Sequence, residues 1–375
     1  MDGRSRFEVV IVGAGIAGAS LAYFLAESGL TDVLLLERED QLAYHSTGRS
    51  AAVLSELDPV AALRQLKTLA APFLREPPAG FAEHPLLARS GVMAVFAGAA
   101  WDAFQQAAPV LEADGMRLAL LGRTEVLARV PVLAADQVDG AVLLPDDGHI
   151  DVHELLSAYL RHARARGAAL RLGAEVIGLR VDGGRCTGVV TRGGEYRAAL
   201  VVNAAGAWAG EVARAAGAIP IPLVPHRRTI VTFAPPAGID VRAWPFVICD
   251  GHGVYFAPES GGVKLSPMDE DPMPPCDARP DEVVIATALE RLGVIAPALV
   301  PRALGRCWAG LRSFVPDRLH VVGADPRLPG LFWLAGQGGC GIETSPIIGR
   351  LAADLILHGT TTRFDADLLS PARFV

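Results

Sequence analysis

The strongest structural signal in the chain is FEVVIVGAGIAGASLAYFLAESGLTDVLLLE, residues 7–37. It opens with an apolar run at 9–12 and passes through Gly13, Gly15 and Gly18. Small and apolar residues then continue to about residue 27, and a second apolar run covers 33–36. This order predicts a strand, a glycine turn, a helix and a second strand.

The glycines of this stretch stand at the spacing of a dinucleotide-binding turn. Gly13 permits a tight turn, Gly15 leaves room for a pyrophosphate, and Gly18 lets the helix lie close to the sheet. The phosphates would meet free N–H groups at the start of the helix. Glu37 follows where a carboxylate accepts hydrogen bonds from a ribose, and it would repel a 2′-phosphate. We therefore expect a Rossmann-like domain and disfavour an NADP-type ligand.

A membrane segment is the main alternative for this stretch. Residues 9–26 carry no charge and follow Arg4 and Arg6, as in a signal peptide or a membrane span. The functional spacing of the glycines, the charge of Glu8 and the immediate second strand favour a buried domain start instead. We expect no transmembrane segment.

Composition indicates a compact α/β protein. The 375 residues are 51% hydrophobic and 20% charged, with 40 glycines, and the length suits two domains. A net charge of −7 offers no basic field, so nucleic acid is not an expected partner. The five cysteines are scattered and lack a CxxC pair, which favours a reducing compartment. The simplest localisation is cytoplasmic.

The order of strand-like and helical patterns predicts two interleaved domains. Residues 1–88, 146–216 and 305–375 form the predicted nucleotide-binding domain. Residues 89–145 and 217–304 form the second domain, whose many prolines and short apolar runs favour a meandering sheet. The fold class is therefore α/β with an added α+β domain on a mainly antiparallel sheet.

Three further segments are candidates for cofactor contact. The loop at 41–52 is rich in small and hydroxyl residues, although it also suits an ordinary helix-capping loop. The strand ending at 200–208 runs into small residues, which also suits a tightly packed strand exit. The loop QGGCGIET at 337–344 precedes a helix that we expect to be capped by Ser345 and to end before Gly359. If the ligand is a flavin, the positive N-terminal end of this helix would stabilise the negative charge that develops on the reduced ring.

Together, GAGIAG with Glu37, the loop STGRSAA, and WAGLR followed by AGQGGCGIETSP resemble the D-amino-acid oxidase superfamily of FAD enzymes over essentially the whole chain. YHSTGRSAA, NAAGAW, PHRRT and WAGLRSFV are most similar to bacterial FAD-dependent D-arginine dehydrogenase. The resemblance implies non-covalent FAD and oxidation of a D-amino acid or related carboxylate-bearing amine. Hydride would pass to flavin N5, and the imino acid would hydrolyse to a keto acid.

The resemblance also implies site residues. Arg228, Arg312 and Tyr255 would hold the substrate carboxylate, because guanidinium forks and a phenol suit that group. The Gly339 carbonyl would orient the amine, and His252 would line the pocket. The implied cofactor contacts are Gly13, Ala14, Gly15, Ile16, Ala17, Gly18, Glu37, Arg38, His45, Ser46, Thr47, Gly48, Ser50, Ala51, Val176, Ala204, Ala205, Gly206, Trp208, Gly310, Arg312, Gly338, Gly339, Cys340, Gly341, Ile342, Glu343 and Thr344.

The chain departs from the arginine enzyme at four pocket positions. Val92 replaces a carboxylate that reads the guanidinium, so D-arginine is not the expected preferred substrate. Val53 replaces a histidine, which leaves Glu343, Tyr255 or water as the general base. Asp58 replaces an aromatic lid residue and Glu343 a glutamine, and both carboxylates could attract an amine or another cation, although Asp58 also suits a mobile, solvated position.

Other interpretations stay open at this point. A 2-hydroxy acid could be the substrate on the same scaffold, or the protein could be a flavoprotein subunit without turnover. Oxygen or a quinone could accept the electrons. His149 and His153 stand four apart near three aspartates, but Asp151 suits a helix cap and we expect no metal site. Cys340 could attach flavin covalently, although a packed small residue is the simpler reading.

Overall fold

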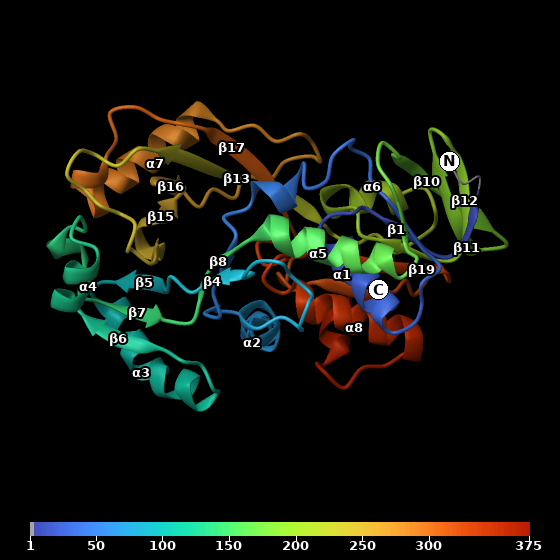
Figure 1. The fold of residues 1–375 in the computed structure, drawn as a ribbon, viewed down its shortest axis with the longest axis horizontal. Helices are drawn as coiled ribbons and strands as arrows, with labels where there is room; N and C mark the ends of the chain where they lie inside the picture. Colours follow the sequence, from blue (N-terminus) through green and yellow to red (C-terminus); the bar gives the residue numbers. More distant parts are fainter. Residues whose placement is uncertain (1–3) are drawn as a thin grey trace.

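A computed structural model describes residues 4–375, so residues 1–3 of the predicted first domain lie outside the described part. Its two large sheets lie side by side along the long axis of the molecule (Figure 1). In the first sheet, β1 runs parallel to both β2 and β12, with Val10 beside Leu34 and Val201. The strand order is β10 (Val176–Asp182), β11 (Arg185–Thr191), β12 (Gly194–Asn203), β1 (Arg6–Val12), β2 (Val33–Leu36) and β9 (Ala169–Arg171), and β12 also pairs with β19 (Leu331–Ala335), which pairs with β18 (Val321–Ala324).

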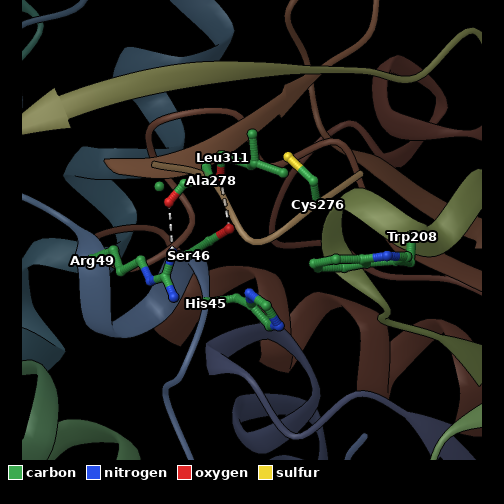
Figure 2. Close-up of a pocket in the computed structure, with 8 residues that line it drawn as sticks. His45, Ser46, Arg49, Trp208, Cys276, Ala278 and Leu311 are labelled. Atoms are coloured by element: carbon green, nitrogen blue, oxygen red, sulfur yellow. Dashed lines mark hydrogen bonds between the residues drawn. The ribbon is translucent and has the colours of Figure 1, made fainter. Parts of the chain in front are cut away.

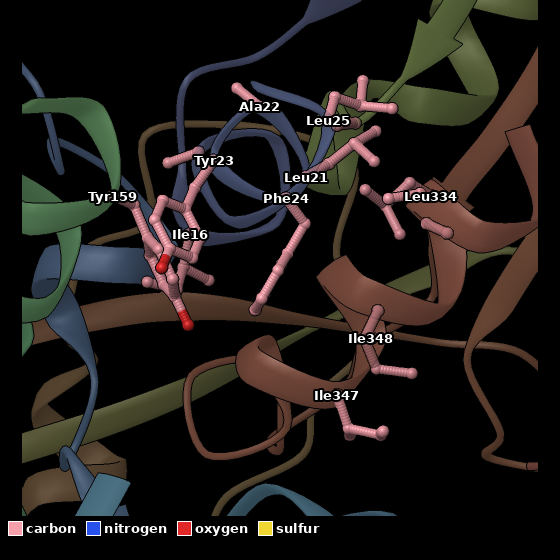
Figure 3. Packing of buried hydrophobic residues seen from close by; sticks show 14 of the residues in the cluster. Ile16, Leu21, Ala22, Tyr23, Phe24, Leu25, Tyr159, Leu334, Ile347 and Ile348 are labelled. Carbon is pink, nitrogen blue, oxygen red and sulfur yellow. The ribbon is translucent and has the colours of Figure 1, made fainter. Parts of the chain in front are cut away.

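Helices α1 (Ile16–Glu27), α5 (Val152–Ala165) and α8 (Ser345–His358) pack together beside this sheet (Figure 3). Tyr23 and Phe24 of α1 contact Tyr159 of α5, with ring centroids 5.5 and 6.2 Å apart. Gly349 lets α8 approach α1, because a Cβ there would lie 2.8 Å from Ser20 Oγ. The uncharged run at 9–26 therefore belongs to a buried core. Within residues 4–375, no helix is long and apolar enough to cross a membrane.

The second sheet is antiparallel except where β14 runs parallel to β5, which confirms the expected fold class. Helices α3 (Ala99–Ala113), α4 (Arg123–Arg129) and α7 (Glu282–Ile295) accompany it. Strand β17 follows our boundary at residue 305 but pairs with β13, so it extends this second sheet and carries Arg312 into it. The order is β17 (Cys307–Phe314), β13 (Val224–Phe233), β16 (Gly262–Ser266), β15 (Val254–Glu259), β14 (Phe246–Cys249), β5 (Val92–Phe96), β7 (Gly140–Leu144) and β6 (Ala119–Gly122).

A small sheet of β3 (Val53–Leu54), β8 (Gly148–Ile150) and β4 (Leu87–Ala88) connects the two halves. Leu54 is buried in the core around α1, whereas its neighbour Val53 packs against the apolar cluster of the second sheet. This difference follows from the alternation of side chains along a strand. Helix α2 (Ala61–Arg75) follows β3 and packs against α8. The small sheet thus places Val53 at the junction where a site between the halves can form.

Candidate active site

A cavity of about 320 Å³ lies at the glycine turn between β1 and α1. Five separate segments line it: the turn itself, the end of β2, the loop at 45–47, the start of β10 at 175–177, and the strand exit with the short helix after it at 204–212. The predicted residues that the structure brings together here are Gly13, Gly15, Glu37, Arg38, His45, Ser46, Thr47, Val176, Ala204, Ala205, Gly206 and Trp208. Their convergence gives one site that can hold a nucleotide.

Local geometry at the turn fits a dinucleotide. Gly13 has φ +100°, and a Cβ there would lie 2.5 Å from the Ala204 carbonyl oxygen, so only glycine fits. The N–H groups of Gly15, Ala17 and Gly18 donate no hydrogen bond within the described chain. Free N–H groups at a helix start bind phosphate. The residues of the turn therefore fit the pyrophosphate of FAD.

The side chains of Glu37 and Thr47 accept hydrogen bonds from two other N–H groups of the turn. Glu37 Oε2 accepts a hydrogen bond from Ala14 N at 3.0 Å, and Thr47 Oγ1 accepts one from Ile16 N at 3.1 Å. Gly48 allows this loop to close on itself, because a Cβ there would overlap the Ala43 carbonyl. The loop predicted from its hydroxyl residues thus packs directly on the first helix.

A narrower hollow continues from the cavity toward β17 (Figure 2). It shares His45, Ser46 and Trp208 with the cavity. Ser46 Oγ donates to the Leu311 carbonyl at 2.7 Å, and an Arg49 Nη1–H donates to the Ala278 carbonyl at 3.0 Å. Arg49, Cys276 and Ala278 were not predicted to line the site. Only Arg49 gave a sequence signal, because it is a basic residue in a loop of small residues. The residues that line this hollow but not the cavity are Arg49, Cys276, Ala278, Leu311 and Gly310, of which Gly310 was already an implied cofactor contact.

The loop before α8 presents further N–H donors. No hydrogen bond inside residues 4–375 uses the N–H groups of Gly339, Gly341, Ile342 or Glu343. An anionic flavin edge suits such a row of donors beside a helix start. The predicted Ser345 cap is wrong by one residue. Thr344 is the N-cap, and its hydroxyl donates instead to the Cys340 carbonyl at 2.8 Å.

The two arginines implied as the carboxylate clamp lie on neighbouring strands. Arg228 of β13 faces Gly310, and Arg312 of β17 faces His226, so the two side chains are diagonal neighbours on one face of the sheet. Burial lowers the pKa of Arg312 from its usual value, and the charge of Arg228 lowers it further. Burial and the neighbouring guanidinium disfavour positive charge on Arg312, and Glu270 offsets only part of this effect. The clamp therefore favours an anion.

Glu270, which the sequence analysis missed, supplies an anion to this clamp. Its Oε1 accepts hydrogen bonds from Arg228 Nη2 at 3.0 Å, Arg312 Nη1 at 2.9 Å and Arg318 Nη2 at 3.0 Å. Burial alone would raise the pKa of Glu270, but Arg312, Arg318 and Arg228 together lower it. Glu270 is therefore ionised in the clamp.

Three predicted pocket residues belong to one apolar cluster beside the clamp. Val53, Val92 and Tyr255 pack with Phe246 and Met268. The rings of Tyr255 and Phe246 lie 5.0 Å apart. The cluster offers an apolar wall to whatever the clamp binds. The structure places His252, another predicted pocket residue, in contact with Gln137, with its Nε2 3.1 Å from Gln137 Oε1.

Asp58 and Glu343 do attract a cation, but that cation is Lys67 of α2. Lys67 Nζ lies 2.9 Å from Asp58 Oδ2 and 3.1 Å from Glu343 Oε1. Glu343 Oε2 also accepts from Ser55 N at 2.8 Å. All three side chains are largely buried, so Asp58 is no solvated lid and Glu343 is no free base. In the sequence, Lys67 falls on the otherwise apolar face of α2, and this position could have indicated a buried cation that needs carboxylate partners.

A second buried lysine lies on β16. Lys264 Nζ is 2.7 Å from the Ala51 carbonyl, 3.0 Å from Glu259 Oε2 and 3.2 Å from His149 Nδ1. Burial lowers the pKa of Lys264, and Glu259 partly offsets this effect. Burial, reinforced by Lys264, lowers the pKa of His149 to about 4.

Two alternatives remain from the sequence: a metal site near Asp151 and a covalent flavin link at Cys340. Asp151 caps α5 by accepting from Glu154 N at 2.8 Å, as expected. No group of three or more candidate metal ligands occurs in the described residues. Burial raises the pKa of the Cys340 thiol to about 12, which leaves little thiolate for a covalent flavin link.

Comparison with known proteins gives relatives along the whole chain. The 4-methylaminobutanoate oxidase (formaldehyde-forming) of Paenarthrobacter nicotinovorans is 28% identical over 99% of this chain and 46% of its own length. Human mitochondrial dimethylglycine dehydrogenase is 27% identical over 99% of this chain and 45% of its length. The chain thus spans about half the length of these curated relatives.

Solved structures share the fold over nearly their full length. The L-proline dehydrogenase of P. horikoshii has a TM-score of 0.89 and 25% identity, with 99% of this chain and 98% of that chain covered. Glycine oxidase of Geobacillus kaustophilus has a TM-score of 0.83 and 26% identity, with 98% of each chain covered. These findings do not single out D-arginine dehydrogenase, the relative that the sequence suggested. Residues 8–355 match the family described as FAD dependent oxidoreductase (DAO), and the chain belongs to that family.

Proposed function

We propose that this protein oxidises the carbon–nitrogen bond of a small amino acid that carries a primary or N-alkylated amine. The observation that carries this proposal is the pair of arginines, Arg228 and Arg312, on one face of the second sheet beside an apolar wall. FAD, when bound, supplies the two-electron acceptor. The chain supplies the orientation of the substrate.

The side chains of the site suit a small substrate. Arg228 and Arg312 would bind the carboxylate through charge-assisted hydrogen bonds, with Tyr255 as a third donor. The Gly339 carbonyl would accept a hydrogen bond from the amine. Val53 and Val92 would exclude water from the α-carbon, and neither can pair with a guanidinium. This apolar wall disfavours D-arginine.

The names of the relatives extend the proposal to N-alkyl amino acids. Those relatives include dimethylglycine dehydrogenase, sarcosine dehydrogenase, glycine oxidase and L-proline dehydrogenase. None of these names specifies a D-amino acid. We therefore define the proposed substrate class by its small size, its amine and its carboxylate, and not by its chirality. Because Glu343 is committed to Lys67 and Ser55, and Tyr255 is assigned to the carboxylate, water is the expected proton acceptor.

The test is anaerobic bleaching of the flavin absorbance in the purified holoprotein. The panel contains sarcosine, dimethylglycine, glycine, both enantiomers of proline and alanine, D-arginine, and lactate. We expect at least one small amino acid to reduce the flavin, and D-arginine and lactate not to. Reduction by lactate alone would indicate a hydroxy acid enzyme. An oxidised band with every compound would favour a flavoprotein without turnover.

A further inference from the structure

The carboxylate of Glu270 belongs to a segment that lies along the clamp. We call residues 267–281 the acidic strap, because it contains Asp269, Glu270, Asp271, Asp277 and Asp281. Past the end of β16, the strap runs beside the first half of β13. Arg227 N donates to the Asp271 carbonyl at 2.9 Å, and Met273 N donates to the Pro225 carbonyl at 2.9 Å. The strap therefore continues the second sheet past β16 and delivers Glu270 to the arginines.

Glu270 uses the N–H groups that a substrate carboxylate would need. One oxygen, Oε1, accepts from both Arg228 and Arg312, the two arginines of the proposed clamp. A substrate carboxylate bound by the same two guanidiniums would compete with this oxygen. The two carboxylates are also alike in charge, so close approach of both is unfavourable unless Glu270 moves.

We propose that Glu270 is an internal competitor of the substrate, and that the substrate carboxylate displaces it from Arg228 and Arg312. This inference rests on the proposed function of these two arginines. It adds a regulatory element, because the clamp is available only in the fraction of molecules in which Glu270 has left it. The apparent affinity for a carboxylate is reduced by that fraction.

Arg318 provides a place for the displaced carboxylate. It contacts both Glu270 oxygens, each at 3.0 Å from Nη2, whereas Arg228 and Arg312 contact only Oε1. The Arg318 side chain is 46% exposed, against 10% for Arg228 and 25% for Arg312. Glu270 can therefore rotate toward solvent and keep its pair with Arg318, which lowers the cost of leaving the clamp.

The backbone of the strap is anchored on both sides of Glu270. Asp269 accepts from Thr229 N at 2.7 Å and pairs with Arg227 at 3.2 Å. Further along, Asp277 pairs with Arg49 at 2.6 Å. Because these anchors do not involve the clamp, the displacement needs only the Glu270 side chain to rotate. The strap keeps its course along β13.

The test measures the binding of a non-reacting carboxylate, benzoate or acetate, to the oxidised holoprotein by the change in flavin absorbance. Glu270→Gln keeps the shape of the side chain but removes its charge. We expect the dissociation constant to fall about 10-fold or more, because the competing charge is gone. Glu270→Asp, whose shorter side chain reaches the three arginines less well, should fall in between. Glu195→Gln, an exposed partner of Arg180 on the β10–β12 ribbon, is the matched control and should bind as the wild type does.

The outcomes separate this competition by Glu270, which we call the latch, from the proposed function. Unchanged or weaker benzoate and acetate binding by Glu270→Gln, with measurable wild-type binding, would overturn the latch and leave the clamp intact. Yellow holoprotein that binds neither carboxylate in the wild type or in Glu270→Gln would overturn the clamp itself. Binding that appears only in Glu270→Gln supports the latch.

Discussion

A Cβ atom on Gly339 would overlap the guanidinium of Arg312. Gly339 belongs to the loop that leads into α8, whereas Arg312 belongs to β17 of the second sheet. The proposed carboxylate clamp therefore packs against bare backbone of the loop predicted to face the flavin. On the proposed function, this contact would link the position of the substrate carboxylate to that of the flavin-facing loop.

Gly339→Ala is expected to displace the Arg312 guanidinium and weaken substrate binding while FAD stays bound. We expect KM for a reducing amino acid to rise about 10-fold to 100-fold, equivalent to the loss of one or two charge-assisted hydrogen bonds. Steady-state kinetics and the flavin content of the purified variant measure both properties. Gly210→Ala is the matched control, because a Cβ there meets no atom within 4 Å. A variant with unchanged KM would show that Arg312 does not depend on Gly339.

Arg312→Ala should remove much of the affinity for the carboxylate. A lost charge-assisted hydrogen bond costs about 1.5–3 kcal/mol, which corresponds to an approximately 10-fold to 150-fold weaker apparent affinity. Arg312→Lys keeps the charge but loses the planar fork, so it should recover only part of the loss. Stopped-flow reduction of the flavin over a range of substrate concentrations gives these values. Equal affinities in all three proteins would remove Arg312 from the clamp.

Glu37→Ala should weaken FAD binding about 10-fold or more without unfolding the protein. The change removes the acceptor of Ala14 N and the group expected to bind the ribose. Titration of apoprotein with FAD, followed by quenching of flavin fluorescence, measures the dissociation constant. Glu175→Ala is an informative comparison, because that carboxylate lines the same cavity but pairs with Arg192 on the surface. If both variants bind FAD as tightly as the wild type, the ribose contact is absent.

The elements that the sequence predicted well are those whose signal is local. Gly13 and Gly15 mark a turn that only glycine permits, and the neighbouring apolar runs form β1, α1 and β2 within a few residues of their expected bounds. Gly359 likewise ends α8 in a left-handed conformation, with φ 73°. Local backbone demands and local periodicity can be read without knowledge of the partner segments.

The partners of charged residues could not be read in the same way. Lys67 and Glu343 are 276 positions apart, and Glu270 lies 42 positions from Arg312 and 48 from Arg318. A sequence pattern shows that a charge falls among apolar residues, but it does not identify the opposite charge that neutralises it. This is why the sequence left Asp58 open between a cation-binding and a solvated position, and why it gave no signal for Glu270.

Lys67→Met should destabilise the protein strongly, because it leaves Asp58 and Glu343 buried without their cation. Removal of one partner from a buried ion pair costs about 3–5 kcal/mol. Burial alone would lower the pKa of Lys67, yet Glu343 and Asp58 raise it above its usual value, so these two carboxylates keep the ammonium charged. Urea unfolding measures the loss. Adding Glu343→Gln and Asp58→Asn to Lys67→Met should restore part of the stability, and a triple variant no more stable than Lys67→Met would contradict the pairing.

Stability should fall as the pH decreases from about 6.5 to about 4, in part because His149 is held neutral. Lys264 Nζ can only donate, so His149 Nδ1 accepts and the imidazole proton lies on Nε2. Protonation of His149 would place two cations 3.2 Å apart. Its pKa is lowered from 6.5 to about 4, so the unfolded chain binds the proton first and unfolding becomes more favourable through this range.

The His149 contribution can be separated from that of other acid-sensitive groups by His149→Gln, which cannot become charged. The wild type should lose up to about 3 kcal/mol between pH 6.5 and pH 4 through this histidine, since one pKa unit corresponds to about 1.36 kcal/mol. His84→Gln, at an exposed position before β4, is the matched control and should keep the wild-type dependence. Urea unfolding at a series of pH values measures each slope. Equal slopes for the wild type and His149→Gln would mean that neither burial nor Lys264 lowers the pKa of His149 in the folded protein.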